Sequence, residues 1–406
     1  MTPSTTSDSP AAARSIVSPD DQKVTFVELF FDLVFVFAVT QIVGLLHVQL
    51  DWVGVGRALL VFWLVWWAWT QFTWTLNAAD TTHPHIELAT LAATSVAFFM
   101  AVAVPGAFGD RAAWFAVPYV LVRVIGLVLH KHVAAAAHPG QHAAVRRFAI
   151  VSSGGLAAVI AGAFAGGDAQ YLLWGMAIFL DFIAAIIGGE SEDWNLHPEH
   201  FGERHGLFVI IALGESLIVA AGGVASGAWT GNLLAVGIAA VAVTCAFWWS
   251  YFPRAKPLLD HALEHQHGAA QSTLARDAFS LLHFPMLCGV IAFAVAVDES
   301  VAHPTDPLAL EARIALAGSV ALFLGGMATA MRRATGRWPV FRIVMALATT
   351  LVVLAAAVPP LAGMAIAFAG IALAAAVEHP RSRGGAWWDH AEQGAEPGAG
   401  DVRATV

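Results

Sequence analysis

The chain has 406 residues, of which 58% are hydrophobic and only 12% charged, and its mean hydropathy is +0.69. Soluble domains carry about 25% charged residues, so this composition excludes a water-soluble globule and indicates a polytopic membrane protein. The formal net charge of −9 comes without any large basic patch, which excludes a nucleic-acid partner.

Twelve apolar segments follow one another along the chain, and each predicts a membrane-spanning helix. The segments are continuous and about 20 residues long, unlike the alternating stretches of about 10 residues that form β-barrels. Short connections at Gly166–Asp168 and Pro359–Pro360 predict antiparallel hairpins. The segments lie near residues 27–47, 53–77, 85–104, 112–131, 147–165, 169–188, 203–224, 232–252, 277–297, 309–331, 339–358 and 361–378.

The basic residues predict the orientation of these helices. With twelve spans, fifteen of the 20 Lys and Arg residues fall on the side of the N-terminus. Three fall on the opposite side, and Arg123 and Arg342 lie inside segments. Because Lys and Arg are retained in the cytoplasm, we predict a protein of the cytoplasmic (plasma) membrane with both termini in the cytoplasm. Residues 1–22 and 381–406 are predicted to be disordered cytoplasmic tails.

An internal repeat is visible, since five short matches occur in the same order at offsets of 175 to 194 residues. They pair Glu28 with Glu203, WTQF (69–72) with WSYF (249–252), FMAVAV (99–104) with FAVAV (293–297), Phe148 with Phe341, and GMAI (175–178) with GMAI (363–366). We therefore predict an all-α protein built from two six-helix repeats, at 24–190 and 200–380. Six helices is an even number, so the two repeats insert in parallel, as in some transporters.

Acidic residues inside the apolar helices are the main candidates for function, because charge in lipid is costly and marks ion or substrate paths. Glu28 and Asp32 lie one helical turn apart in the first segment, and Glu28 and Glu203 lie at the cytoplasmic interface. Glu215 lies about 18 Å deeper than Glu203, between Gly214 and Ser216. In the repeat alignment, Thr40 is its counterpart.

These acids also have simpler interpretations. An acid in the first helical turn complements the helix dipole, which would explain Glu28 and Glu203. Small residues beside Glu215 are also typical of a helix-packing seam. Asp32 lies beyond the first turn and has no such explanation, so it favours a polar site.

Further polar residues lie near the membrane midplane or inside helices. Arg123 and Asp181 are predicted to pair, either as a structural ion pair or as one that breaks during transport. Gln71 lies in the aromatic stretch 62–74, which either packs plainly or lines part of a cavity. His205 and His283 are expected to join Glu28, Asp32, Glu203 and Asp277 around a polar cavity that faces the cytoplasm.

Histidine spacing offers only a weak signal for a metal. His261 and His265, and likewise His200 and Glu203, have spacings that can bind Zn²⁺. No Cys partner or repeated Glu-x-x-His pattern accompanies them, so we predict no metal and no cofactor. The sequence contains no Walker loop, dinucleotide fingerprint or GxSxG elbow.

Three motifs, VELFFDLVFVFAVTQI (27–42), ERHGLFVIIALGESLIV (203–219) and HFPML (283–287), resemble the bacterial low-temperature-requirement A family. The resemblance covers roughly residues 24–380. It implies an integral membrane protein, and the family name records a cold-growth phenotype. The resemblance assigns no substrate and carries over no catalytic residue.

The leading hypothesis is a secondary transporter or proton/ion-coupled permease for a small solute or ion, with its site between the halves. A membrane-embedded enzyme that acts on a lipid, and an ion channel or membrane-state sensor, remain alternatives. The sequence does not decide the oligomeric state.

Overall fold

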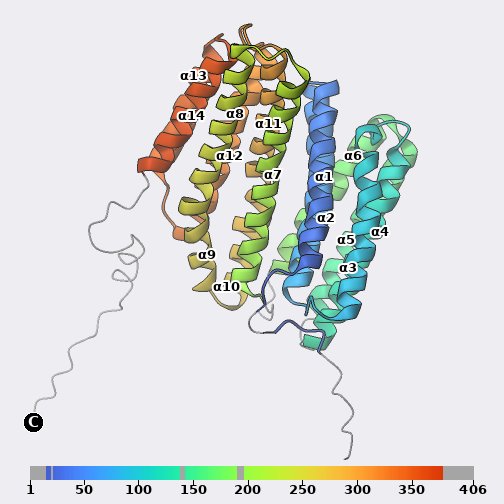
Figure 1. Ribbon diagram of the computed structural model, residues 1–406. Coiled ribbons are helices and arrows are strands. Elements are labelled where there is room, and N and C mark those ends of the chain that lie inside the picture. Colours follow the sequence, from blue (N-terminus) through green and yellow to red (C-terminus); the bar gives the residue numbers. More distant parts are fainter. Residues whose placement is uncertain (1–14, 20–21, 138–141, 190–195, 378–406) are drawn as a thin grey trace, which may run out of the picture.

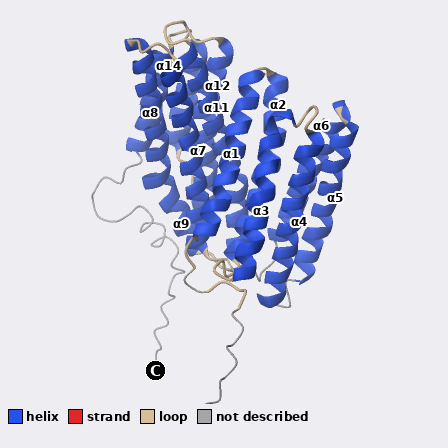
Figure 2. Ribbon diagram, turned by 45° about the vertical axis from the view of Figure 1, so that its right-hand side comes forward, coloured by secondary structure: helices blue, strands red, loops and turns tan. Residues whose placement is uncertain are grey.

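The computed structural model describes residues 15–19, 22–137, 142–189 and 196–377. Within these ranges the chain forms long helices and no β-strand, and eleven helices are long and apolar enough to cross a membrane. The helices run side by side in one bundle (Figures 1 and 2). The predicted all-α polytopic class is therefore confirmed. The predicted disordered tail at 381–406 lies outside the described residues.

The first half of the chain contains one helix for each of the six predicted segments, and its ends have local causes. Asp51 accepts a hydrogen bond from the Gly54 amide at 2.8 Å and caps the second helix. Gly166 and Gly167, with φ of +65° and +53°, form the predicted tight turn between the fifth and sixth helices. The helices are α1 (Phe26–Val48), α2 (Trp52–Asn77), α3 (Pro84–Ala103), α4 (Ala112–Ala137), α5 (His142–Ala165) and α6 (Gly167–Gly189), with a 3₁₀ turn η1 (Val104–Gly106) after α3.

The second half differs in two long composite helices. The helix of the eighth predicted segment continues through a π-helical turn into a short further helix. The helix of the ninth predicted segment follows a short helix and a second π-helical turn. The elements are α7 (Pro198–Ser226), α8 (Gly231–Ser250), η3 (Tyr251–Ala255), α9 (Lys256–Glu264), α10 (Gly268–Leu274), η4 (Ala275–Leu281), α11 (His283–Ala302), α12 (Leu310–Thr335), α13 (Val340–Ala355) and α14 (Pro360–Val377).

The composite helices are too long to lie within a bilayer. Residues Gly231–Glu264 form 34 continuous helical residues, which span about 51 Å at about 1.5 Å each. The hydrocarbon core is about 30 Å thick, so the hairpin of α9 and α10 projects beyond it. This hairpin lies at the end of the bundle where α1 begins, which we call the α1 end (Figure 1).

The eleventh predicted segment is shorter than expected. It was predicted to extend to residue 358, but α13 ends at Ala355 and has only 16 residues. Val358 and Pro359 each precede a proline, and a residue before proline disfavours the helical conformation. Eleven helices of spanning length and one shorter apolar helix therefore replace the twelve expected spans among the described residues.

Helices α1 and α2 stand between the other helices of the first half and those of the second half (Figure 1). Helix α1 packs against α2 and α3, and across the centre against α7 and α11. The two halves share a pattern of neighbouring helices. In the first half, α1 packs against α3, α3 against α4, α4 against α5, and α5 against α6. In the second half, α7 packs against α11, α11 against α12, α12 against α13, and α13 against α14. One hydrophobic core extends through both halves.

Residues 15–19 and 22, which fall in the predicted N-terminal tail, contact the C-terminal end of α2. Val17 forms a β-bridge with Ala79, and the Ser18 amide donates to the Ala78 carbonyl at 3.1 Å. Gln22 donates to the Leu76 carbonyl at 2.9 Å. These bonds go to carbonyl groups at the C-terminal end of α2, where the helix has fewer partners of its own to offer, so the segment has a physical reason to lie there.

Candidate functional site

Helices α1 and α7 begin at the same end of the bundle and face one another through polar side chains. Helix α1 presents Glu28, Asp32 and Thr40, which are spaced by four and eight residues and share one face. Helix α7 presents His200 and Arg204, four residues apart, and Glu215 about three turns further. The two polar faces meet in a buried interface between the halves of the chain.

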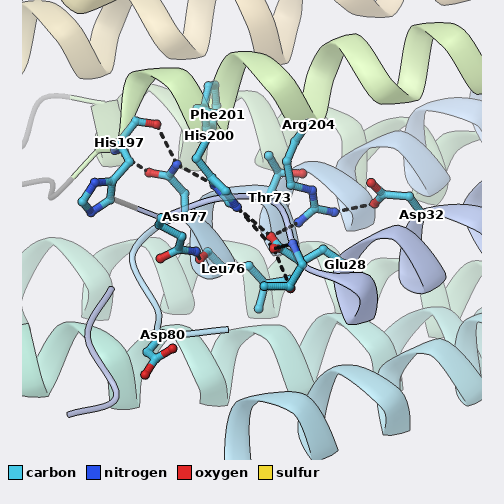
Figure 3. Close-up of polar contacts among 12 residues, drawn as sticks. Glu28, Asp32, Thr73, Leu76, Asn77, Asp80, His197, His200, Phe201 and Arg204 are labelled. Atoms are coloured by element: carbon cyan, nitrogen blue, oxygen red, sulfur yellow. Dashed lines mark hydrogen bonds and ion pairs between the residues drawn. The ribbon is translucent and has the colours of Figure 1, made fainter. Parts of the chain in front are cut away.

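Glu28 is completely buried and is bound from both helices. Its Oε1 atom accepts a hydrogen bond from Arg204 Nη1 at 3.1 Å, and its Oε2 atom accepts from His200 Nε2 at 3.3 Å. Its Oε2 atom accepts from the Thr25 amide at 3.0 Å and the Thr25 hydroxyl at 2.9 Å. Glu28 therefore caps α1, as the simpler interpretation held, and also joins α1 to α7 (Figure 3).

Arg204 lies between Glu28 and Asp32 (Figure 3). Its Nη2 atom donates to Asp32 Oδ1, which also accepts from Trp69 Nε1 of α2 at 2.7 Å. Asp32 Oδ2 and Arg204 Nε have no hydrogen-bond partner among the described residues, although both side chains are fully buried. An unpaired buried carboxylate oxygen is rare and needs an explanation.

The protonation of His200 follows from its neighbour Asn77 on α2. The Asn77 amide is fixed in orientation, because its Oδ1 accepts from the His197 amide and its Nδ2 donates to the His197 carbonyl, both at 2.9 Å. Asn77 Nδ2 therefore also donates to His200 Nδ1, at 3.1 Å. In this arrangement His200 accepts at Nδ1 and donates from the Nε2 atom that faces Glu28.

The cluster of Glu28, Asp32, His200 and Arg204 has unequal charges. Two carboxylates face a single guanidinium, which is always positive, and a neutral imidazole. One negative charge is left over in a site that excludes water, and such a charge is costly unless it is neutralised. The unpaired Asp32 Oδ2 atom is where a proton or a cation would neutralise it.

Glu203 does not belong to this cluster, contrary to the sequence-based expectation. Its side chain is exposed, whereas the next residue, Arg204, is fully buried. Successive residues of a helix point about 100° apart, so only one of the two can face α1. The repeat alignment makes Glu203 the counterpart of Glu28, but it is the neighbouring Arg204 that contacts Glu28.

Glu215 lies apart from the cluster and binds α1 directly. Its Oε2 atom accepts a hydrogen bond from the Thr40 hydroxyl at 2.5 Å, and the residue is 2% exposed. Thr40 is eight residues, or about 12 Å, beyond Asp32 along α1. Between the two levels, Trp69 packs on Phe208 with ring centres 4.6 Å apart. The expected staggered acids are present, and an aromatic layer separates them.

Arg123, Asp181 and Gln71 form a second buried cluster, in the first half only. Arg123 Nη2 donates to Asp181 Oδ1 at 3.2 Å, which is the expected pair. Arg123 Nη1 donates to the Tyr119 hydroxyl at 2.8 Å, and its Nε donates to Gln71 Oε1. Gln71 thus binds Arg123 rather than lining a cavity. A Cβ on Gly126 would lie 2.9 Å from Gln71 Nε2, so this glycine makes room for the contact.

His205 and His283 are buried beside the first cluster but make no polar contact with it. His205 Nδ1 donates to the Phe201 carbonyl at 2.9 Å, and His283 Nδ1 donates to the Ala278 carbonyl at 2.9 Å. His283 Nε2 accepts from the Tyr251 hydroxyl at 2.7 Å. The two rings lie 5.4 Å apart, at the edge of the aromatic layer.

Asp277 does not join the acids as expected. It is bound instead by Arg276 and by Arg333, the latter at 2.8 Å. The polar cavity predicted around all six residues is therefore replaced by separate pairs.

Sequence reasoning did not place Arg204, Asn77 or Trp69 in the site, and it named His200 only for its spacing to Glu203. The signal was present in helical phase, since residues 200, 204, 208 and 215 recur at spacings that place them on one face. Arg204 had been counted only as a cytoplasmic charge. No sequence pattern marks Asn77 and Trp69 as site residues, because their contacts depend on how α2 packs against α1 and α7.

Comparisons with known proteins identify a family and a relative of the chain. The sequence matches the family described as bacterial low temperature requirement A protein (LtrA) over residues 23–377. An uncharacterized protein of Rhizobium meliloti (strain 1021) is 28% identical over 315 residues, which make up 76% of each chain. No solved structure matches the chain.

Proposed function

The chain belongs to the bacterial low-temperature-requirement A family, and we propose that it works as a proton- or cation-coupled secondary transporter of the plasma membrane. In this proposal the α1 end faces the cytoplasm. The cluster of Glu28, Asp32, His200 and Arg204 is both the coupling site and the gate on that side. The observation that carries the proposal is the Asp32 carboxyl with its unpaired Oδ2 atom, buried between helices from the two halves of the chain.

The location of the cluster supports a gate. Arg204 of α7 binds two carboxylates of α1, so its ion pairs hold the halves together at the α1 end. A proton or cation on Asp32 weakens its attraction to Arg204 and frees α7 to move. Binding of the coupling ion is thereby linked to the separation of the halves, as alternating access requires.

A cavity at the other end of the same interface supports a solute site. It has a volume of about 420 Å³ and lies between α1 and α2 of the first half and α11 and α12 of the second half. Apolar side chains such as Ile42, Phe62 and Ile291 line it, together with the acids Asp51 and Glu311. We infer that the solute is an amphiphile with an apolar body and a cationic group. A pocket of this size suits a small organic molecule.

The repeat interpretation is consistent with this mechanism. Thr40 and Glu215 are counterparts at the offset of 175 residues, and they bind one another across the interface. Two counterparts in contact lie close to a pseudo-two-fold axis. The corresponding helix neighbours of the halves give further support.

Replacing Asp32 by asparagine is expected to abolish coupling. The substitution keeps the shape and the oxygen that accepts from Trp69 and Arg204, but removes the charge that binds the proton. In proteoliposomes loaded with a pH dye, addition of amphiphilic cations should move protons with the wild-type protein. The same addition should move at least about tenfold fewer with Asp32→Asn.

Glu203→Gln is the matched control, because it removes an acid from the same end of the bundle without touching the cluster. It should leave coupled flux unchanged. Equal flux in Asp32→Asn and the wild type would remove Asp32 from the mechanism. Non-saturable single-channel currents would favour a channel over a carrier.

Replacing Glu215 by glutamine is a separate prediction. The amide still accepts from the Thr40 hydroxyl, so the fold should persist, while the charge of Glu215 in the interface between α1 and α7 is lost. We expect a raised half-saturation concentration for the cationic solute, by about tenfold, and little change in the stoichiometry of protons. Concentration-dependent uptake in proteoliposomes measures both. A change in proton stoichiometry instead would identify Glu215 as the coupling residue.

A further inference from the structure

Three potential metal ligands gather where α9 ends, in the hairpin at the α1 end. They are His261, Glu264 and His265, and one ligand atom from each lies within 4.8 Å of the others. None belongs to the clusters described above. His261 is half-buried, and the other two side chains are exposed.

Helical geometry explains the convergence. His261 and His265 are four residues apart and share one helix face, with ring centres 3.9 Å apart. His265 Nδ1 donates to the His261 carbonyl at 2.8 Å, which fixes its tautomer and leaves Nε2 as the ligand atom. Glu264, three residues after His261, adds a carboxylate next to the two imidazoles.

We propose that His261, Glu264 and His265 bind a divalent transition-metal ion, with Zn²⁺ as the best fit. Two imidazoles and one carboxylate, with a fourth position open to water, are a ligand set that Zn²⁺ commonly uses. Mg²⁺ and Ca²⁺ prefer all-oxygen sites and are poorly suited to two imidazoles. The spacing of His261 and His265 alone does not predict a metal site. The structure adds the Glu264 carboxylate, which lies within reach of both imidazole rings.

The position of the site makes it accessible and gives it a route to the core. The composite helix of α8 and α9 is longer than the hydrocarbon core is thick, so its end lies in water. Asp260, the residue directly before His261, packs against Gly202 of α7, where a Cβ would collide with its carboxylate. A metal that stiffens the end of α9 therefore acts next to the α7 segment that carries Arg204. Metal binding does not depend on the proposed transport function.

Metal titration of the full chain tests the proposal. The protein should be purified with a tag that contains no histidine, stripped with EDTA and titrated with ZnCl₂ by calorimetry. We expect a site that binds one Zn²⁺ per chain and is weakened at least about tenfold in His265→Ala, because even outer-shell partners of a ligand are worth about 10–100-fold. Co²⁺ should give the visible bands of a tetrahedral site, and MgCl₂ should give no binding there.

His267→Ala is the matched control, because it removes an exposed imidazole two residues away that is outside the convergent group. It should retain full affinity. Glu264→Gln should weaken binding without abolishing it, since the two imidazoles remain. Absence of Zn²⁺ binding, or binding that survives both His265→Ala and His261→Ala, would overturn the proposal. These side chains are exposed or half-buried, and size-exclusion profiles will show that the variants fold.

Discussion

Replacing Arg204 by methionine is expected to lower the free energy of unfolding by about 3–5 kcal/mol, because it leaves Glu28 and Asp32 buried without their cation. Methionine fills similar space, so the loss reports charge rather than volume. Chemical denaturation in nanodiscs or mixed micelles measures it. Loss of the gate should also leave the α1 end more open.

The matching substitution on the other partner has a very different expected effect. Asp32→Asn removes the left-over negative charge and keeps one carboxylate against one guanidinium, so stability should fall little or rise. The triple change of Arg204→Met, Glu28→Gln and Asp32→Asn should recover most of the stability that Arg204→Met loses. If Asp32→Asn and Arg204→Met were equally destabilising, the unequal charge count would be wrong.

The helices could be predicted from sequence because lipid imposes a simple rule. A backbone in hydrocarbon must satisfy its own hydrogen bonds, so every long apolar run becomes a helix. The first segment, expected at 27–47, is the helix Phe26–Val48. At the membrane–water interface this rule no longer applies, and helix ends are harder to predict. The polar sequence after Ser250 gave no sign that the helix would turn through η3 and continue to Glu264.

The candidate site was predictable only in part. The acids of α1 could be identified because charge is rare in an apolar run. The proposed repeat aligns Thr40 with Glu215, but their hydrogen bond was not predicted. The partner of Glu28 depends on the rotation of α7 about its own axis. A shift of one residue along α7 decides whether Glu203 or Arg204 faces Glu28. An alignment of two halves with low sequence similarity is not accurate to one residue.

The charged residues that have no charged counterpart in the other half of the chain were easier to predict. Arg123 and Asp181 lie at similar depth on different helices, and a lone charge there would be costly, so each needs the other. The role of Gln71 as a bridge to Arg123 depends on the close contact of α2 and α4 at Gly126, which leaves no trace in hydropathy.

Replacing Arg123 by methionine is the second large expected effect, with a loss of about 3–5 kcal/mol in the free energy of unfolding. The change leaves the Asp181 carboxylate buried, with one oxygen already unpaired among the described residues. It also removes the donors that bind Tyr119 and Gln71. The measurement is again chemical denaturation in nanodiscs or micelles.

The double variant of Arg123→Met and Asp181→Asn decides what the pair is for. Without a charge on either side, the three helices α2, α4 and α6 lose only hydrogen bonds, so most of the stability should return. If the pair is structural, coupled flux should return with it, because the Asp32 cluster lies on other helices and is untouched. If stability returns while flux stays at the level of empty liposomes, the ion pair must break and reform during transport. The second half has Ala317 and Ala369 at the positions aligned with Arg123 and Asp181. It has no such pair, so this step would belong to the first half alone.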